Sequence, residues 1–465
     1  MEAFSTRRRG ARTGVRRGKV ARSIGCEPLE SRTLLSGNSA GSSVLGTVVD
    51  RLGDTYLVGS FRGTVDFDPG PAVVNLTSRG GSDAFLVKLD PAGGIRWAKA
   101  FGSTGNDAAR AIAVNPLGGQ LLVVGNFSGT LSLDPTDPAA VLTAAGGQDG
   151  FLAIFDADGN DLLARSFGGS LADGINAIAV DLTGTVYVGG EFTGTVDFDL
   201  LNGGRMLTST GRAGRTDGFI AAYDLTGNCL WARGIGAGKD DAVFGLAVSP
   251  AGLVVAVGEF EQNVDFDPGP GVVRRASQGD EDGFVLALNR AGEHRWSFTV
   301  GGREDDAVRA VACDAAGNVF IGGEFEKTVD FDPSSRVTTL RSQGDQDGFV
   351  AKYSPEGRFA WVRGFGSPED DGIFAVAADV GGGVVAGGRR AVAVNSTTTG
   401  SNGRPQTRVR WREAGYAVKL DDSGRVGWSA SFLTAAVGAT SGDRDDGRDD
   451  RETRKRRVIA STRDD

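Results

Sequence analysis

The sequence contains few of the residues on which common enzyme sites depend. Its 465 residues include one histidine, three cysteines and two methionines. Ser/His/Asp and Cys/His catalytic sites, and zinc sites with histidine ligands, need more histidine than His294 alone supplies. Cys26, Cys229 and Cys313 are too few and too widely spaced for a disulfide framework. These absences remove most hydrolase hypotheses and leave the redox compartment open.

Long apolar runs are also missing. No stretch approaches the roughly 18 apolar residues of a membrane-spanning helix, so we expect no membrane span. The basic N-terminal segment is not followed by the apolar stretch of about 7–15 residues that a classical secretory signal needs. Apolar residues nevertheless make up 40% of the chain, which is enough for a large core and excludes global disorder.

Charge is distributed unevenly along the chain, whose net charge is −9. Residues 1–40 carry nine basic and three acidic residues, and residues 441–465 carry eight of each, so the part between them has a net charge of −15. An acidic body repels polyanions. We therefore expect no nucleic-acid partner and favour cations or cationic surfaces.

Glycine is abundant, with 73 residues, more than twice the usual share of about 7%. The glycines belong to a repeat that three markers define at intervals of 65–68 residues. The first marker is an Asp-Gly-Phe type element that begins at Asp83, Asp149, Asp217, Asp282 and Asp347. The second is a phenylalanine that ends an apolar run, at Phe61, Phe127, Phe192, Phe260 and Phe325. The third is Trp97, Leu163, Trp231, Trp296, Trp361 and Trp428.

Each repeat has the pattern of four short antiparallel strands. Residues 310–314 and 319–325 are Val- and Phe-rich runs joined by an Asp314-x-x-Gly317 turn, in which aspartate starts the turn and glycine supplies positive φ. A second turn of this kind precedes each tryptophan position. Between strands two and three lies an excursion that we expect to begin with a short strand and to turn at a Pro-Gly pair.

We predict an all-β protein, a six-bladed β-propeller at residues 41–432, flanked by disordered charged ends at 1–40 and 433–465. The predicted repeats are 41–106, 107–172, 173–240, 241–305, 306–370 and 371–432. The repeat resembles the bacterial β-propeller repeats called SBBP, on the residues Asp240-Asp241, Ala177–Asp181, Val186–Gly189 and Asp83–Leu89. That resemblance implies the propeller fold and says little about activity. The first repeat departs from it, because Ser42-Ser43 replace the Asp-Asp element.

The N-terminal segment carries a second resemblance. Residues 29–36 are similar to the Leu-Glu-Pro-Arg-x-Leu-Leu motif near the N-terminus of many large extracellular proteins of planctomycete bacteria, with Ser31 in place of the proline. The resemblance implies export to the cell surface. The alternative is a disordered basic tail.

Five aspartates precede the inner strands of repeats two to six: Asp107, Asp173, Asp241, Asp306 and Asp371. Converging carboxylates without basic partners could bind Ca²⁺, which takes six to eight oxygen ligands. Each aspartate could instead cap its own turn through backbone N–H groups. Recurrence in every repeat favours capping, because a structural cap is needed in each blade. Calcium is thus an alternative, and no other cofactor is expected.

The sixth repeat is basic where the others are acidic. Its excursion includes Arg404, Arg408, Arg410, Trp411 and Arg412. Residues 408–412 alternate as in a strand with one solvated side. Arginine and tryptophan are enriched at interface hot spots, so one interpretation is a docking edge for an acidic partner. The other is a degenerate repeat in which Trp411 packs inward. His294 is predicted to be an exposed turn residue.

We expect a non-catalytic binding or scaffold module at or outside the cell surface, with a protein or polysaccharide as its partner. One alternative is a carbohydrate-active enzyme that uses paired aspartates. It would need one pair of carboxylates in an environment unlike the others, whereas repeats two to five look alike. Another alternative is an intracellular protein-interaction propeller. The sequence leaves the ligand, the oligomeric state and the closure between the first and sixth blades open.

Overall fold

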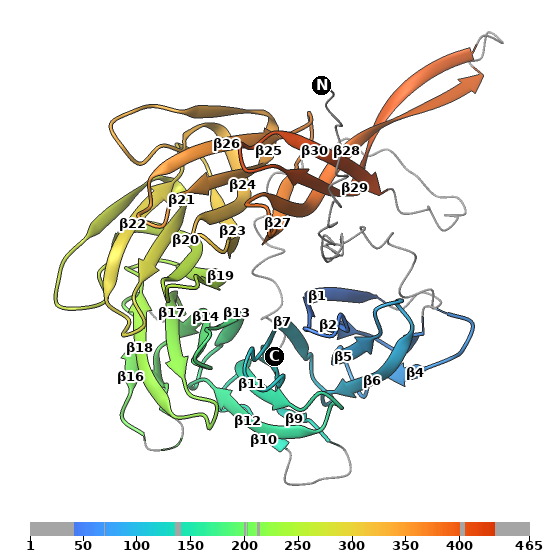
Figure 1. Ribbon diagram of the computed structural model, residues 1–465, viewed down its shortest axis with the longest axis vertical. Coiled ribbons are helices and arrows are strands. Elements are labelled where there is room, and N and C mark those ends of the chain that lie inside the picture. Colours follow the sequence, from blue (N-terminus) through green and yellow to red (C-terminus); the bar gives the residue numbers. More distant parts are fainter. Residues whose placement is uncertain are drawn as a thin grey trace, which may run out of the picture.

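The computed structural model describes residues 41–432, apart from 69, 135–140, 200, 202, 212–213 and 400–404. The described residues form strands and turns and no helix, so none of them makes a helix that could cross a membrane. Six four-stranded antiparallel sheets are arranged in a ring (Figure 1). The prediction of a six-bladed β-propeller is confirmed. The predictions for residues 1–40 and 433–465 concern segments outside the described residues.

The first three blades share one plan of four main strands. The first blade consists of β1 (Ser42–Val49), β2 (Thr55–Phe61), β5 (Asp83–Leu89) and β6 (Ile95–Phe101). The second consists of β7 (Ala108–Val114), β8 (Leu121–Phe127), β11 (Asp149–Phe155) and β12 (Asp161–Phe167). The third consists of β13 (Gly174–Val180), β14 (Val186–Thr193), β17 (Thr216–Tyr223) and β18 (Cys229–Ile235).

The last three blades have longer middle strands. The fourth blade consists of β19 (Ala242–Val248), β20 (Val254–Asp265), β21 (Arg274–Leu288) and β22 (His294–Val300). The fifth consists of β23 (Ala307–Cys313), β24 (Val319–Asp330), β25 (Thr339–Tyr353) and β26 (Phe359–Phe365). The sixth consists of β27 (Gly372–Ala378), β28 (Val384–Thr399), β29 (Pro405–Leu420) and β30 (Val426–Phe432).

The excursions between the second and third strands of the first three blades form separate two-stranded hairpins. These are β3 (Thr64–Asp66) with β4 (Asn75–Thr77), β9 (Thr130–Ser132) with β10 (Val141–Thr143), and β15 (Thr195–Asp197) with β16 (Met206–Thr208). The predicted short strand at the start of the excursion is therefore present. In the fourth and fifth blades the same segment continues β20 and β24 after a bulge.

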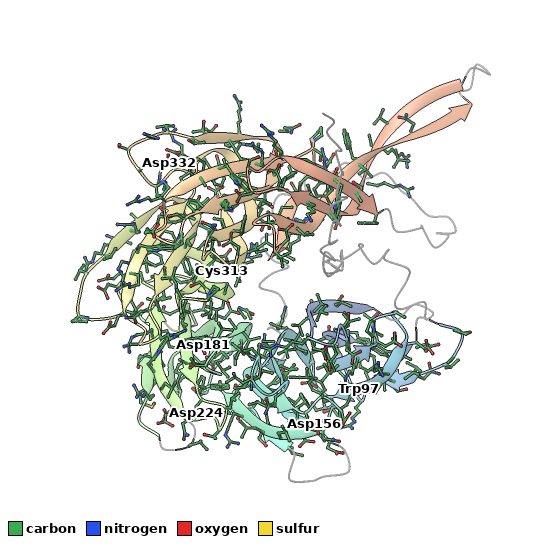
Figure 2. All side chains as sticks on the ribbon, in the orientation of Figure 1. Trp97, Asp156, Asp181, Asp224, Cys313 and Asp332 are labelled. Atoms are coloured by element: carbon green, nitrogen blue, oxygen red, sulfur yellow. The ribbon has the colours of Figure 1, made fainter. Side chains whose placement is uncertain are left out.

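The hairpins within each blade close with the expected turn. The carboxylate of Asp314 accepts hydrogen bonds from the backbone N–H groups of Ala316 and Asn318, and Gly317 has a φ of 85°. A side chain at that φ would be strained, which explains the glycine. Asp156, Asp181 and Asp224 start turns of the same kind and lie at separate places around the ring (Figure 2).

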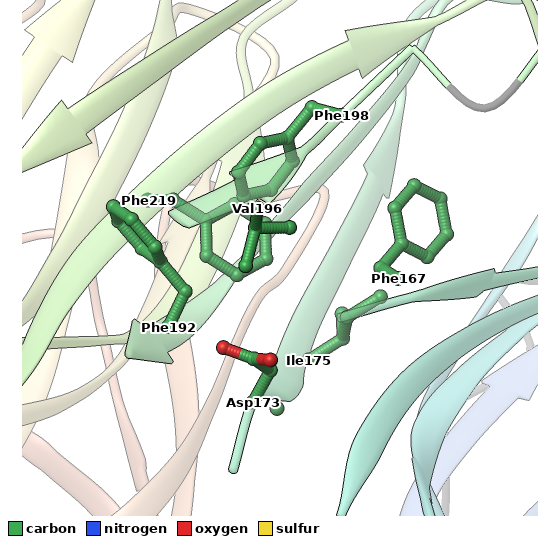
Figure 3. A pocket seen from close by; sticks show the side chains of 8 residues that line it. Phe167, Asp173, Ile175, Phe192, Val196, Phe198 and Phe219 are labelled. Carbon is green, nitrogen blue, oxygen red and sulfur yellow. The ribbon is translucent and has the colours of Figure 1, made fainter. Parts of the chain in front are cut away.

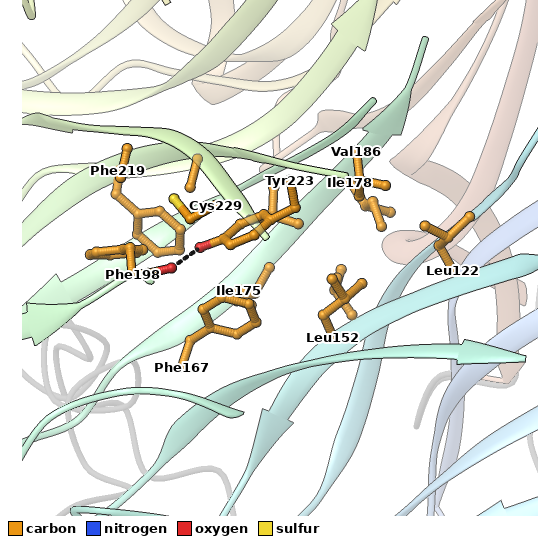
Figure 4. Close-up of a cluster of buried hydrophobic side chains, with 14 of the residues drawn as sticks. Leu122, Leu152, Phe167, Ile175, Ile178, Val186, Phe198, Phe219, Tyr223 and Cys229 are labelled. Carbon is orange, nitrogen blue, oxygen red and sulfur yellow. Dashed lines mark hydrogen bonds between the residues drawn. The ribbon is translucent and has the colours of Figure 1, made fainter. Parts of the chain in front are cut away.

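The hydrophobic core lies between blades. One cluster joins Leu122 and Leu152 of the second blade to Ile175, Ile178 and Val186 of the third (Figure 4). Tyr223 belongs to the same cluster, and its hydroxyl donates a hydrogen bond of 2.9 Å to the carbonyl of Phe198 (Figure 4). Because the sheets of the second to fifth blades pack against a neighbour on both faces, these blades stabilise one another.

The tryptophan positions join neighbouring blades. The indole N–H of Trp231 donates a 2.8 Å hydrogen bond to the carbonyl of Arg290, in the outer hairpin of the next blade. Gly292 of that hairpin lies against the indole, since a Cβ added to Gly292 would lie 2.8 Å from Trp231 Cδ2. Trp231 therefore packs between the third and fourth blades. We call this arrangement of a tryptophan and the glycine of the next blade's hairpin the tryptophan clasp.

The innermost strands pack on one another in chain order, β1 on β7, β7 on β13, β13 on β19, β19 on β23 and β23 on β27. Within the described part of the chain no comparable packing joins β27 to β1. Figure 1 shows the sixth blade, in red, standing apart from the first blade, in blue. The ring thus has five packed junctions and one opening, which we call the seam.

Candidate functional site

The five candidate aspartates lie one at each packed junction, directly before the inner strand of their blade. All five are buried, with Asp107, Asp173, Asp241, Asp306 and Asp371 between 1% and 5% exposed. Asp306 accepts hydrogen bonds from the N–H of Gly302 at 2.6 Å and the N–H of Glu326 at 2.8 Å. It therefore joins the junction loop to the end of the second strand of its blade.

The other candidates bind backbone in the same way. Asp241 accepts from the N–H groups of Ala237 and Glu261, and Asp371 accepts from Ala391 at 2.6 Å. Asp107, Asp173, Asp241 and Asp306 are thus each occupied by their own junction loop, as a cap would be, whereas Oδ2 of Asp371 is buried without a hydrogen bond from any described residue. The described residues contain no group of three or more His, Cys, Asp or Glu side chains that could hold a metal ion. The structure distributes the five carboxylates around the ring.

Burial changes the acidity of these junction aspartates. It raises the pKa of Asp107 and Asp173 to about 6, of Asp241 to about 7 and of Asp306 to about 8. The backbone hydrogen bonds oppose the shift without cancelling it. The nearby carboxylate of Asp282 adds like-charge repulsion at Asp306. A carboxyl group whose pKa is raised in this way carries a proton at mildly acidic pH.

A small pocket opens at the junction of the second and third blades (Figure 3). Phe167, Phe192, Phe198 and Phe219 surround it, and Asp173 is the one charged side chain in its lining (Figure 3). Both carboxylate oxygens of Asp173 already accept backbone hydrogen bonds. The rest of the lining is apolar, so the pocket presents one carboxylate that is already hydrogen-bonded to backbone.

A buried ion cluster joins the fourth and fifth blades. Arg309 on β23 contacts Glu324 Oε1 at 2.8 Å and Glu259 Oε2 at 3.2 Å. Its guanidinium carbon lies 4.4 Å from the centroid of the Phe244 ring. Burial raises the pKa of Glu259 to about 8, and Arg309 opposes that rise. Sequence reasoning missed this cluster, although Arg309 occupies a bulge position that varies from blade to blade: Leu45, Arg110, Asn176, Phe244, Arg309 and Phe374.

The predicted docking edge lies on β28 and β29, which form a long hairpin that projects from the ring (Figure 1). We call residues 391–399 and 405–413 the ribbon. Arg410 and Arg412 are exposed, as are Trp411 (40%) and Val409 (55%). The interpretation in which Trp411 packs inward is therefore wrong. Arg408 pairs with Ser396 through the backbone, and Arg404 lies outside the described residues.

Pairing in the ribbon places its side chains on two faces. Arg410 pairs with Val394 and Arg412 with Val392, whereas Trp411 pairs with Ala393. Arg410 and Arg412 therefore share one face with Val392 and Val394. Trp411 lies on the other face. The sequence pattern predicted one solvated side, but both faces are exposed here because no other sheet packs on the ribbon.

His294 also differs from its prediction as an exposed turn residue. It is the first residue of β22, it is half-buried, and its Nε2 lies 3.2 Å from Ser297 Oγ. Burial lowers its pKa below the usual 6.5. None of the hydrogen bonds of the described residues joins it to an acidic side chain.

No protein-family model matches the chain. A regulatory protein, FlaEY of Caulobacter vibrioides, is 24% identical over 168 residues, which cover 34% of this chain and 17% of that protein. The match thus spans about a sixth of the length of the curated relative.

Two solved structures show similar strand arrangements at low sequence identity. The WD40 domain of Neurospora crassa Pan2 is 8% identical, with a TM-score of 0.31 over 74% of this chain and 91% of that one. A member of the DUF4221 family from Bacteroides vulgatus is 11% identical, with a TM-score of 0.33 over 76% and 92% of the two chains. A propeller fold generally supports a role in binding or as a scaffold.

Proposed function

We propose that this protein is a non-catalytic binding module, acting at or outside the cell surface, that recognises an acidic protein surface through its ribbon. The observation that carries the proposal is that the ribbon exposes Trp411 on one face and Arg410 and Arg412 on the other. A tryptophan that its own fold leaves 40% exposed is available to a partner. Tryptophan and arginine are the residue types that contribute most to protein interfaces.

Charge supports an acidic partner. The part of the chain from residue 41 to residue 440 has a net charge of −15, yet the exposed strand of the ribbon carries several arginines. Guanidinium groups stay charged at every physiological pH and bind carboxylates with two parallel hydrogen bonds. A partner with clustered carboxylates is attracted to the ribbon and repelled by the remaining acidic surface, which would fix its orientation.

The junction aspartates support a role without catalysis. A hydrolase that uses two carboxylates needs one pair in a distinct environment. Here Asp107, Asp173, Asp241 and Asp306 share one environment, since each is buried and accepts hydrogen bonds from backbone N–H groups, and the fifth, Asp371, is also buried and accepts one from Ala391. Carboxylates occupied in this way serve the fold. The paired-aspartate glycosidase remains the alternative, and loss of polysaccharide cleavage on Asp306→Asn would favour it.

The test compares two charge-reversal variants of the full-length protein. Arg410→Glu/Arg412→Glu alters the ribbon, and Arg274→Glu/Arg341→Glu makes the same charge change at exposed positions of β21 and β25. We expect the ribbon variant to lose at least tenfold in retention on immobilised polyglutamate at 150 mM salt, while the control variant keeps most of it. Equal loss in both variants would show nonspecific charge attraction and contradict the proposal.

Two further measurements separate the alternatives. Ribbon-dependent retention on heparin but not on polyglutamate would move the partner from an acidic protein to an acidic polysaccharide. Fractionation of the source cells, with protease added outside intact cells, tests the location. We expect the full-length protein in the surface or secreted fraction. Its recovery in the cytosolic fraction alone would favour the intracellular interaction propeller.

A further inference from the structure

At two of the five packed junctions, those after the third and the fifth blade, a glycine of the second strand contacts a branched side chain of the next blade. A Cβ added to Gly189 would lie 2.7 Å from Cγ1 of Val243, and one added to Gly322 would lie 2.6 Å from Cγ2 of Ile373. The missing side chain therefore leaves room for the residue that enters from the next blade. Strand register places Gly387 of β28 at the position of Gly189 and Gly322.

At the seam both halves of this contact lack a partner. The atom nearest to a Cβ on Gly387 is the carbonyl oxygen of Tyr416, at 3.9 Å and in the same blade. The residue of the first blade that corresponds to Ile373 is Val44, which is 43% exposed. Its counterparts in the other five blades are 0–1% exposed: Ala109, Ile175, Val243, Val308 and Ile373.

The tryptophan clasp has both of its parts at the seam as well. Trp428 of β30 stands at the position of Trp361, whose indole N–H donates to the carbonyl of Asp422. In the first blade the corresponding hairpin contains Gly93, with a φ of 84° and no atom within 4 Å of its Cβ position. At four of the packed junctions that glycine lies against a tryptophan of the preceding blade, as Gly424 lies against Trp361 at 2.7 Å, and at the other one Gly227 lies against Leu163.

We propose that the sixth blade closes on the first blade of the same chain as a latch, with Val44 entering at Gly387 and Trp428 covering Gly93. The occupant is the same chain because two separate contacts fit at once and in the register of the other five junctions. The first and sixth blades of one molecule lie on the two sides of the opening (Figure 1). A second copy would therefore have to enter between them.

The latch lacks two contacts that stabilise the other junctions. Those junctions have a connecting loop and a buried aspartate such as Asp306, whereas Ser42 stands at the aspartate position of the first blade. Within the described residues, β1 and β30 belong to different sheets, so no shared sheet joins the first and sixth blades there. Side-chain packing alone therefore holds the seam closed, and it can open without unfolding a blade.

The experiment uses disulfide formation in a full-length background in which Cys26, Cys229 and Cys313 are replaced by serine or alanine. The control pair is Gly322→Cys/Ile373→Cys, at a packed junction where the two Cβ positions lie 3.4 Å apart. That separation is close to the range of disulfides, about 3.5–4.5 Å. The test pair is Gly387→Cys/Val44→Cys, at the seam.

We expect the test pair to form an intrachain disulfide under mild oxidation with a yield within a factor of two of the control. The product should have the mass of a monomer by light scattering. A disulfide-linked dimer would assign the seam to a second copy and overturn the latch. Free thiols in the test pair with a complete disulfide in the control would show a permanently open seam and would also overturn it.

A second pair of variants tests the latch without cysteines. Gly322→Leu puts a side chain into an occupied contact, and Gly387→Leu puts the same side chain into the contact that the latch requires. We expect both to lower the melting temperature by several degrees. If the melting temperature of Gly387→Leu equals that of the unmodified protein while Gly322→Leu falls, the seam does not close.

Discussion

The excursion between the second and third strands packs into the core in the fifth blade and projects from the ring in the sixth. In the fifth blade β24 bends at Lys327, which has a φ of 55°, and the segment beyond it buries Val329 and Phe331 to 0–1% exposure. In the sixth blade the pairing of β28 with β29 runs without a break from Arg389 to Thr399. The first excursion completes a core, and the second becomes the ribbon.

One residue position accounts for much of the difference. The residue two places after the conserved marker phenylalanine has positive φ in blades one to five: Gly63, Gly129, Gly194, Gln262 and Lys327. Val392 stands there in the sixth blade. A β-branched residue is strongly disfavoured at positive φ, so the strand continues straight. The apolar anchors are also gone, since Arg390 replaces the marker phenylalanine and Ser396 replaces Phe331. The candidate interface thus lies in the repeat that lacks the positive-φ residue and the apolar residues of the other excursions.

The largest effect that follows from this comparison is on stability. Phe331→Ala removes a buried aromatic side chain and should lower the free energy of unfolding by about 3–5 kcal/mol. Trp411→Ala removes an aromatic of similar size from an exposed strand and should change stability by less than about 0.5 kcal/mol. Chemical denaturation of both variants measures the contrast. Similar losses in the two would mean that Trp411 has a folding partner.

The free energy of unfolding should also depend on pH. The dependence should come from the junction aspartates and not from the arginines of the ribbon. The folded-state pKa values of Asp107, Asp173, Asp241 and Asp306 are raised from 3.8 to about 6–8. Groups with raised pKa values contribute stability that is complete below the unfolded value and is lost as pH rises through the folded value. We expect a melting temperature several degrees higher at pH 5 than at pH 8.5.

The lower limit of that pH range follows from carboxylates with the opposite shift. The N–H of Gly204 lowers the pKa of Asp197, so its contribution is lost as pH falls below about 4. Melts should therefore be compared between pH 5 and 8.5. Arginines do not titrate in that range, so retention by the ribbon should stay constant. A melting temperature that rises with pH would contradict the assigned shifts.

A smaller effect is expected from exchanging the residues at the bend. Gly194→Val forces a β-branched residue to a φ of 75° and should cost about 1–2 kcal/mol or more. Val392→Gly, in the straight ribbon, lacks that strain and should cost under about 1 kcal/mol. Thermal melts of the two variants measure the difference. A larger loss at Val392 than at Gly194 would show that bend geometry does not separate the two blades.

The smallest expected effect is that of calcium. A ligand at 100 times its dissociation constant stabilises the folded state by about 2.7 kcal/mol. Because the oxygens of Asp241 and Asp306 accept backbone hydrogen bonds, we expect melts of residues 41–432 in millimolar Ca²⁺ and in excess EDTA to agree within error. A clear rise with Ca²⁺ would make the junction aspartates metal ligands after all.

Much of the fold was predictable because the repeat shows the same residue in the same place six times. The glycine and aspartate of each turn need only local geometry, so Asp314 and Gly317 could be assigned from four residues of sequence. The exposure of Val44 could not be predicted from the sequence. Its counterparts in the other blades are also apolar, and they are buried because another blade packs on them. The same limit applies to Arg309, whose partners Glu259 and Glu324 lie in two different blades.

Every blade is formed by one continuous segment of the chain, and each of the five packed junctions joins blades that are neighbours in the chain. Contacts with short sequence separation form quickly, because little loop entropy is lost before they form. The chain can therefore acquire structure blade by blade as it leaves the ribosome, each new sheet using the previous one as its template. The contact between the first and sixth blades has the largest sequence separation of all, and it would be the last to form and the first to be lost.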